Sequence, residues 1–195
     1  MLRDGRLERA HHIRSVGETA FGELADAEVV AIDVPIGLGP DRVADRLARD
    51  ALRGAASTVF STPSREVLEQ KFRPGLGVSA QAHALGRRIL HVTELAPTDP
   101  RLHEAHPELS FRTMNGGEPL RYRKKQAGGV FERLALLQRE GIDLSDLGDA
   151  ARVPIDDVLD AAACAWTAHR IGTGEASSLP DPPDERDDLR VAIWF

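Results

Sequence analysis

The sequence has a single cysteine, Cys164, among its 195 residues. One cysteine cannot form an internal disulfide, and it excludes a cysteine-rich zinc site. No run of eighteen apolar residues occurs, so we expect no membrane span. Residues 1–12 are polar and lack the apolar centre of a secretory signal. We therefore expect a cytoplasmic protein that does not bind membranes.

Aromatic residues are also scarce, at 5% of the chain, so a core has to rest on Val, Leu, Ile and Ala. The hydrophobic fraction of 42% is enough for such a core. The formal net charge of −6 argues against a protein that coats nucleic acid with its whole surface, although it is compatible with a local basic groove. The length fits one domain over 1–195, with a helical insertion over about 41–96.

Strands alternate with helices along the chain, which is typical of an α/β fold. The clearest strand covers 28–39, where a near-continuous apolar run is typical of a central strand. Pro35 and Gly37 end this strand and leave Asp33 at its carboxyl end, where open α/β sheets bind ligands. The other expected elements are strands over 6–16, 103–111 and 189–195, helices over 17–27, 41–54, 78–95, 129–141 and 154–172, and loops over 57–66, 112–129 and 177–188.

The segment HEAHPELSF at 103–111 places Glu104, His106 and Glu108 at alternate positions. In a strand, alternate side chains point to one face. Because unpaired buried charges are costly, that face has to be solvated or arranged around a cationic group. His103 would point to the opposite face from His106, so the two histidines do not indicate a zinc site.

The expected helix over 154–172 opens with DDVLDA, in which Asp160 shares a face with Asp156 and with Asp157. Acidic residues in a first turn interact favourably with the helix dipole, which accounts for Asp156 and Asp157 but less well for Asp160. Carboxylates this close repel unless a cation lies among them or one is protonated. Together with Asp33 they indicate a site for hard divalent ions such as Mg²⁺, and two such ions about 4 Å apart can cleave a phosphodiester.

The basic run RYRKK at 121–125 is either a solvated face or a phosphate-binding segment. Lys125 is the sharper candidate, because a Gly-Gly pair at 128–129 and a helix start follow it. Helix N-termini attract anions. The run leaves both interpretations open.

Six short segments resemble, in the same order, motifs of DUF429, a family described as predicted nucleases with an RNase H-like fold. They are AIDVPIGL at 31–38, DRVADRLAR at 41–49, STVFSTPSR at 57–65, EAHPELSF at 104–111, KKQAGG at 124–129 and DDVLDAAACAWTAHR at 156–170. The resemblance runs from about residue 28 to the C-terminus. It implies an RNase H-like mixed sheet with helices on both faces, and acidic residues gathered at the strand ends and on the last helix.

Taken with the resemblance, the candidate residues fall into three groups. The expected metal ligands, for Mg²⁺ or Mn²⁺, are Asp33, Asp160 and Glu108. The expected catalytic residues are Asp33, Asp157, Asp160, Glu104 and His106. The residues expected to bind substrate phosphate are Lys124, Lys125 and Arg65. This set predicts a metal-dependent nuclease or phosphodiesterase whose partner is nucleic acid.

The first residues depart from the family pattern. Relatives begin with a Gly-Val-Asp-Gly-like strand whose Asp is the first RNase H acid, whereas this sequence begins MLRDGRLERA. We therefore expect a sheet that lacks its N-terminal strand and has an unpaired edge, which a homodimer would cover. Two alternatives to a nuclease follow. One is a catalytically inactive binding or scaffold protein of the same fold, and the other is a small-molecule phosphohydrolase, which the acidic net charge favours.

Overall fold

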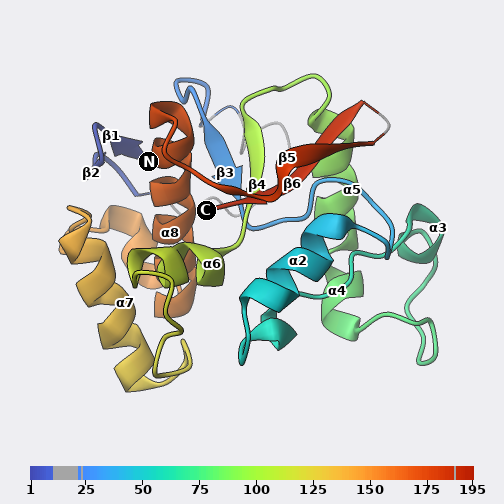
Figure 1. Ribbon diagram of the computed structural model, residues 1–195, viewed down its shortest axis with the longest axis horizontal. Coiled ribbons are helices and arrows are strands. Elements are labelled where there is room, and N and C mark those ends of the chain that lie inside the picture. The colour runs from blue at the N-terminus through green and yellow to red at the C-terminus, as the bar shows by residue number, and fades with distance from the viewer. Residues whose placement is uncertain (11–21, 23, 187) are drawn as a thin grey trace.

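Figure 1 shows the computed structural model of the chain, which describes residues 1–10, 22, 24–186 and 188–195. It has a mixed α/β fold, as the alternation of strands and helices predicts. Most of the strand expected over 6–16 and of the helix expected over 17–27 lies outside the described residues. Among the described helices, none combines the length and the apolar character that crossing a membrane requires.

Four strands form one mixed sheet in the order β3-β4-β6-β5. They are β3 (Val30–Ile32), β4 (Leu102–Ala105), β6 (Leu189–Trp194) and β5 (Ser178–Arg186). β3, β4 and β6 run parallel, whereas β5 pairs antiparallel with β6. Within the described residues β3 pairs with β4 alone, so it lies at an edge of this sheet and not at its centre as predicted. The terminal strand predicted over 189–195 is confirmed as β6.

The loop predicted over 177–188 is wrong, because most of this segment forms β5. This segment contains three prolines. Proline lacks the N–H that a central strand needs, but an edge strand tolerates it. β5 is an edge strand, and its register with β6 shifts between Leu179 and Asp184, the stretch that contains the prolines. The sheet position therefore explains the exception.

The strand predicted over 103–111 is also wrong beyond its first residues. β4 ends at Ala105, and Pro107 begins the helix α6 (Pro107–Met114). The fixed φ of proline and its missing N–H suit the first helical position. Glu104 therefore lies on a strand, His106 at the helix N-cap and Glu108 in the first helical turn, so the three side chains do not share one strand face.

The segment between β3 and β4 contains several short helices. It contains α2 (Val43–Ala51), η1 (Ala56–Thr58), α3 (Arg65–Leu68), α4 (Ala80–Ala84) and α5 (Gly86–Leu95). The helix predicted over 41–54 is confirmed as α2. The single helix predicted over 78–95 is divided at Leu85 into α4 and α5, and the loop predicted over 57–66 contains most of η1 and the start of α3.

Two longer helices and a short one follow α6. They are α7 (Ala127–Arg139), η2 (Gly148–Arg152) and α8 (Ile155–Thr173). The helices predicted over 129–141 and 154–172 are therefore confirmed, as α7 and α8. The segment predicted as irregular over 112–129 includes the end of α6 and the start of α7.

Helices cover both faces of the sheet (Figure 1). One core joins β3, β4 and β6 to α2 and α5 through residues such as Val30, Ala48 and Val92. On the other side α8 packs against β3 and β4, and a second core joins α8 to α6 and α7 through Phe111 and Leu137. The site described below lies where these two halves meet.

A short hairpin precedes the sheet. β1 (Leu2–Arg3) and β2 (Arg6–Leu7) pair antiparallel around Asp4 and Gly5, which both have positive φ angles. This Asp-Gly turn is the kind predicted by the dipeptide, since two positive φ angles match the twist of a two-residue hairpin. β1 packs against α8.

Candidate functional site

Asp33 directly follows β3, at the edge of the sheet where the parallel strands end. Two hydrogen bonds fix the backbone beyond it. The Ile36 N–H donates to the Glu104 carboxylate at 2.8 Å, and the Gly37 N–H donates to the Thr93 hydroxyl at 3.0 Å. The turn after Asp33 is therefore tied to both β4 and α5.

Asp160 lies in the second turn of α8, between the fully buried Leu159 and Ala163. The Lys124 ammonium donates to Asp160 Oδ2 at 2.6 Å. The other carboxylate oxygen, Oδ1, is buried and has no hydrogen-bond partner in the part of the chain that the structure describes. Buried acceptors are almost always satisfied, so this oxygen indicates a place where a donor or a cation would bind.

Asp33, Glu108 and Asp160, together with Lys124, form what we call the acidic cluster. Asp33 reaches solvent, yet the protein around it removes enough water to raise its pKa. The charges of His106 and Lys124 lower the pKa of Asp33, and that of Glu108 raises it. The pKa of Asp160 is likewise raised, mainly by burial; Lys124 lowers it, and Asp33 and Glu108 raise it further. The carboxylates are therefore close enough to influence one another.

Lys124 supplies the positive charge of the cluster. Burial on its own lowers the pKa of this amine, but the hydrogen bond to Asp160 and the negative charges of Asp160, Asp33 and Glu108 outweigh burial and raise it. The ammonium therefore stays charged and partly compensates the carboxylates.

Glu108 is held by an arginine. Both of its carboxylate oxygens accept hydrogen bonds from Arg133 Nη2, each at 2.7 Å. Arg133 is only 2% exposed, and its guanidinium lies over the Phe111 ring, 5.3 Å from the ring centre. A buried arginine that contacts a carboxylate in this way fixes its position. Glu108 therefore adds negative charge to the cluster while its own oxygens are already occupied.

His106 lies at the N-cap of α6, close enough to Asp33 to lower the pKa of that carboxyl. Its Nε2 atom is 3.4 Å from the Thr58 carbonyl oxygen. Its Nδ1 atom is buried and finds no hydrogen-bond partner within residues 1–10, 22, 24–186 and 188–195. One ring nitrogen is therefore available to hold or transfer a proton.

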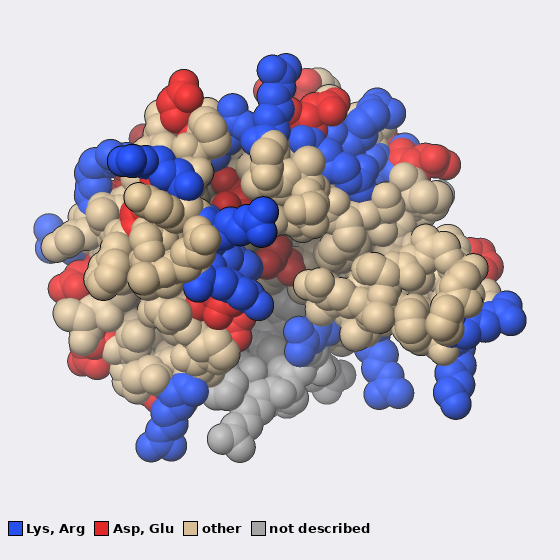
Figure 2. All heavy atoms as spheres, turned by 90° about the horizontal axis from the view of Figure 1, so that it is seen from below, with Lys and Arg blue, Asp and Glu red and all other residues tan. Residues whose placement is uncertain are grey.

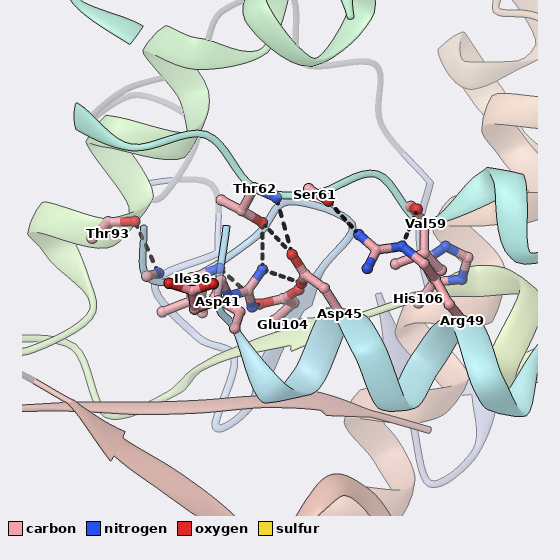
Figure 3. A network of polar contacts seen from close by, with 12 residues as sticks. Ile36, Asp41, Asp45, Arg49, Val59, Ser61, Thr62, Thr93, Glu104 and His106 are labelled. Carbon is pink, nitrogen blue, oxygen red and sulfur yellow. Dashed lines mark hydrogen bonds and ion pairs between the residues drawn. The ribbon is translucent and has the colours of Figure 1, made fainter. Parts of the chain in front are cut away.

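Glu104 belongs to a neighbouring buried network, shown in Figure 3. Its side chain is 5% exposed and accepts hydrogen bonds from the Ile36 N–H and from Arg42. Arg42 also donates to Asp45 and to Thr62, each at 2.7 Å. Burial raises the pKa of Glu104 to about 7, against the lowering effect of Arg42. Glu104 therefore positions the turn after Asp33 and is enclosed by its own partners.

The acidic cluster lies toward the carboxyl ends of β3 and β4, on the lower side of the molecule in Figure 1. Figure 2 looks at this side, where basic and acidic side chains gather around a hollow. Among the described residues, no group of three or more His, Cys, Asp and Glu side chains is arranged so that it could hold a metal ion. A cation bound here would need water or substrate oxygens as additional ligands.

The sequence matches, over residues 1–185, the family described as "Protein of unknown function (DUF429)". The chain belongs to the DUF429 family. No curated protein and no solved structure matches it. The short motifs that indicated this family in the sequence are thus confirmed as a family relationship.

In this DUF429 protein, some of the residues predicted for the functional site lie outside the acidic cluster. Asp157 is exposed, and with Met1 and Ala162 it lines a cavity of about 390 Å³ beside the β1–β2 hairpin. Lys125 is exposed, next to Lys124. Arg65 lies on α3, on the opposite side of Figure 1 from α7 and α8, where it pairs with Glu94 at 2.9 Å.

Two important residues of this DUF429 protein, Arg42 and Arg133, were not predicted from the sequence. The spacing of Arg42 and Asp45 on a helix permits a pair, and such a pair forms at 2.7 Å. The bonds of Arg42 to Glu104 and of Arg133 to Glu108 join residues that are 62 and 25 positions apart. Only the folded chain brings these partners together.

Proposed function

We propose that the acidic cluster is the reaction site of a metal-dependent phosphodiester hydrolase that acts on nucleic acid. One observation carries the proposal. Asp33 lies where the parallel strands end and Asp160 lies on the last long helix. Both carboxylates have raised pKa values, and Asp160 Oδ1 is buried without a partner among the described residues. Carboxylates in this state attract a cation.

The residues present fit Mg²⁺ or Mn²⁺. Asp33 forms no hydrogen bond within the described part of the chain, so its oxygens and Asp160 Oδ1 are available as ligands. Mg²⁺ is usually held by one or two carboxylates together with water and substrate phosphate, so two protein ligands are sufficient. Such an ion would activate a water molecule and neutralise charge on the phosphate.

The side chains around these ligands have separate tasks in the proposed reaction. Lys124 neutralises a phosphate oxygen, since it provides a charged ammonium beside the two carboxylates. His106 holds or transfers a proton at Nδ1. Arg133 holds Glu108 in place, and Glu108 keeps the cluster attractive to cations. Glu104 fixes the turn that presents Asp33.

A second function, that of a non-catalytic binding or scaffold protein, is favoured by Lys124 itself. Its ammonium lies 2.6 Å from Asp160 and provides the cluster with a cation that needs no metal. In this alternative the cluster is a structural ion network. The two functions differ in whether a divalent ion binds and whether a phosphodiester is then cleaved.

Replacement of Asp160 tests the proposal, because Asp157 provides a matched control on the same helix. We expect Asp160→Asn to lose Mn²⁺-dependent cleavage of a labelled oligonucleotide by about a hundredfold or more while the protein remains folded. Asp157→Asn, whose side chain lies outside the cluster, should retain the wild-type rate. Absence of metal-dependent cleavage in the wild-type protein, over DNA and RNA substrates, would favour the scaffold function.

A further inference from the structure

The start of α7 presents an aromatic surface beside exposed cations. Phe131 is 71% exposed and Tyr122 is 46% exposed, although aromatic residues are scarce in this chain. Arg121, Arg123 and Lys125 are exposed and form no ion pair with any described carboxylate. In a protein with a net charge of −6, this concentration of uncompensated positive charge attracts an anionic partner.

The basic segment is fixed to the helix. The Glu132 carboxylate accepts hydrogen bonds from the backbone N–H groups of Arg121 and Tyr122, at 3.1 to 3.3 Å. The Tyr122 carbonyl oxygen accepts one from Arg133 at 3.3 Å. A segment held in this way loses little conformational freedom when a ligand binds.

Glycine allows this close approach. A Cβ on Gly128 would lie 2.8 Å from the Tyr122 ring, so the ring rests directly on the first turn of α7. Phe131 is three residues further along and shares that side of the helix. The Arg121 guanidinium lies over the Tyr122 ring, 5.7 Å from the ring centre. Phe131 is therefore the freer of the two rings.

We propose that Phe131 and the cations of the segment 121–125 bind single-stranded nucleic acid, with Phe131 stacking on a base. The inference rests on the proposed function, because Lys124 of the same segment reaches the acidic cluster and would place a phosphate there. Exposed aromatic rings stack on bases of any sequence, and Lys and Arg bind the backbone phosphates. In a duplex the base faces are already stacked, so the surface selects single strands.

Fluorescence anisotropy with labelled strands of about twelve nucleotides, in EDTA to prevent cleavage, tests the inference. We expect single-stranded DNA or RNA to bind the wild-type protein more tightly than the corresponding duplex. Phe131→Ala should weaken single-strand binding by about fivefold or more. Phe72→Ala is the matched control, because Phe72 is also exposed but precedes α4 in the segment between β3 and β4.

Two further variants separate stacking from other roles. Phe131→Leu keeps an apolar side chain without a ring, so it should bind as weakly as Phe131→Ala. Lys125→Ala should reduce the slope of log affinity against log salt by about 0.7, the value for one phosphate contact on a single strand. DNA and RNA strands compared side by side show which of the two is preferred.

Several results would overturn the inference. They are the absence of single-strand binding, a preference for the duplex, wild-type binding by Phe131→Ala, or an equal loss in Phe72→Ala. A wild-type dimer that Phe131→Ala dissociates would instead assign this surface to self-association. If single strands bind as expected but no metal-dependent cleavage occurs, the proposed function fails while this binding surface stands.

Discussion

At the scale of single residues, Lys124 decides how the acidic cluster behaves without a metal. Its ammonium bonds one oxygen of Asp160 and lowers the pKa of both Asp160 and Asp33. A divalent ion at the same carboxylates would compete with this ammonium for negative charge. Lys124 would then be released toward a substrate phosphate.

Replacement of Lys124 by methionine should therefore strengthen metal binding. We expect Lys124→Met to bind Mn²⁺ several-fold more tightly near pH 7.5, and to be stabilised more by Mn²⁺ than the wild-type protein, because the competing cation is gone. Isothermal titration and thermal unfolding measure the two effects. Lys125→Met is the control, since Lys125 is exposed and, unlike Lys124, forms no ion pair with Asp160. Equal Mn²⁺ affinity in both variants would contradict this role.

At the scale of elements, the junction between the segment 121–126 and α7 determines where Lys124 lies. A Cβ on Gly129 would be 2.0 Å from the Arg123 carbonyl oxygen, a separation that no packing tolerates. Gly172, on α8, provides the opposite case. A Cβ there would meet Val29 at 3.7 Å, which is an ordinary contact.

Alanine at these two glycines should therefore have opposite effects. We expect Gly129→Ala to destabilise the protein by about 2 kcal/mol or more, because the backbone has to shift. We expect Gly172→Ala to leave stability unchanged or raise it by about 0.5 kcal/mol, because alanine favours a helix over glycine. Urea unfolding measures both, and metal binding should weaken in Gly129→Ala alone. Similar unfolding midpoints would contradict the close approach.

At the scale of the whole molecule, buried carboxyl groups make stability depend on pH. The pKa of Glu104 is raised by burial to about 7 in the folded protein, from a reference value of 4.5. Between these two values the folded state holds a proton that the unfolded state has released. Folding is therefore favoured at low pH, and stability falls as the pH rises from 4.5 to 7. The raised pKa values of Asp33 and Asp160 act with the same sign.

We expect the titration of Glu104 to lower the free energy of unfolding by about 3 kcal/mol between pH 4.5 and pH 7. This is on the order of the free energy that corresponds to the shift in its pKa. Glu104→Gln should flatten the pH dependence of unfolding in this range, because glutamine does not titrate. Urea unfolding over pH 4.5 to 8 measures it. Glu185→Gln, an exposed position on β5, should keep the wild-type profile. An unchanged pH profile in Glu104→Gln would show that Glu104 is ionised throughout.

Much of the fold was predictable from local patterns. The helices α2, α7 and α8 and the final strand β6 each depend on the pattern of neighbouring residues, and each was predicted. The expected strand over 103–111 and the loop over 177–188 were wrong. Pro107 begins a helix, and the prolines of β5 are tolerated because this strand lies at a sheet edge, which only the assembled sheet defines.

The candidate site also has features that were predictable from local patterns and features that depend on tertiary structure. Local sequence patterns were enough to predict that Asp33 ends an apolar strand, that Asp160 lies on an apolar helix and that a basic run precedes α7, because these properties belong to short segments. Tertiary structure decided the rest. It placed Lys124 on Asp160, and it bound Glu108 to Arg133 and Glu104 to Arg42. Burial and charge pairing between distant residues set the ionisation of these carboxyls, and no local pattern contains that information.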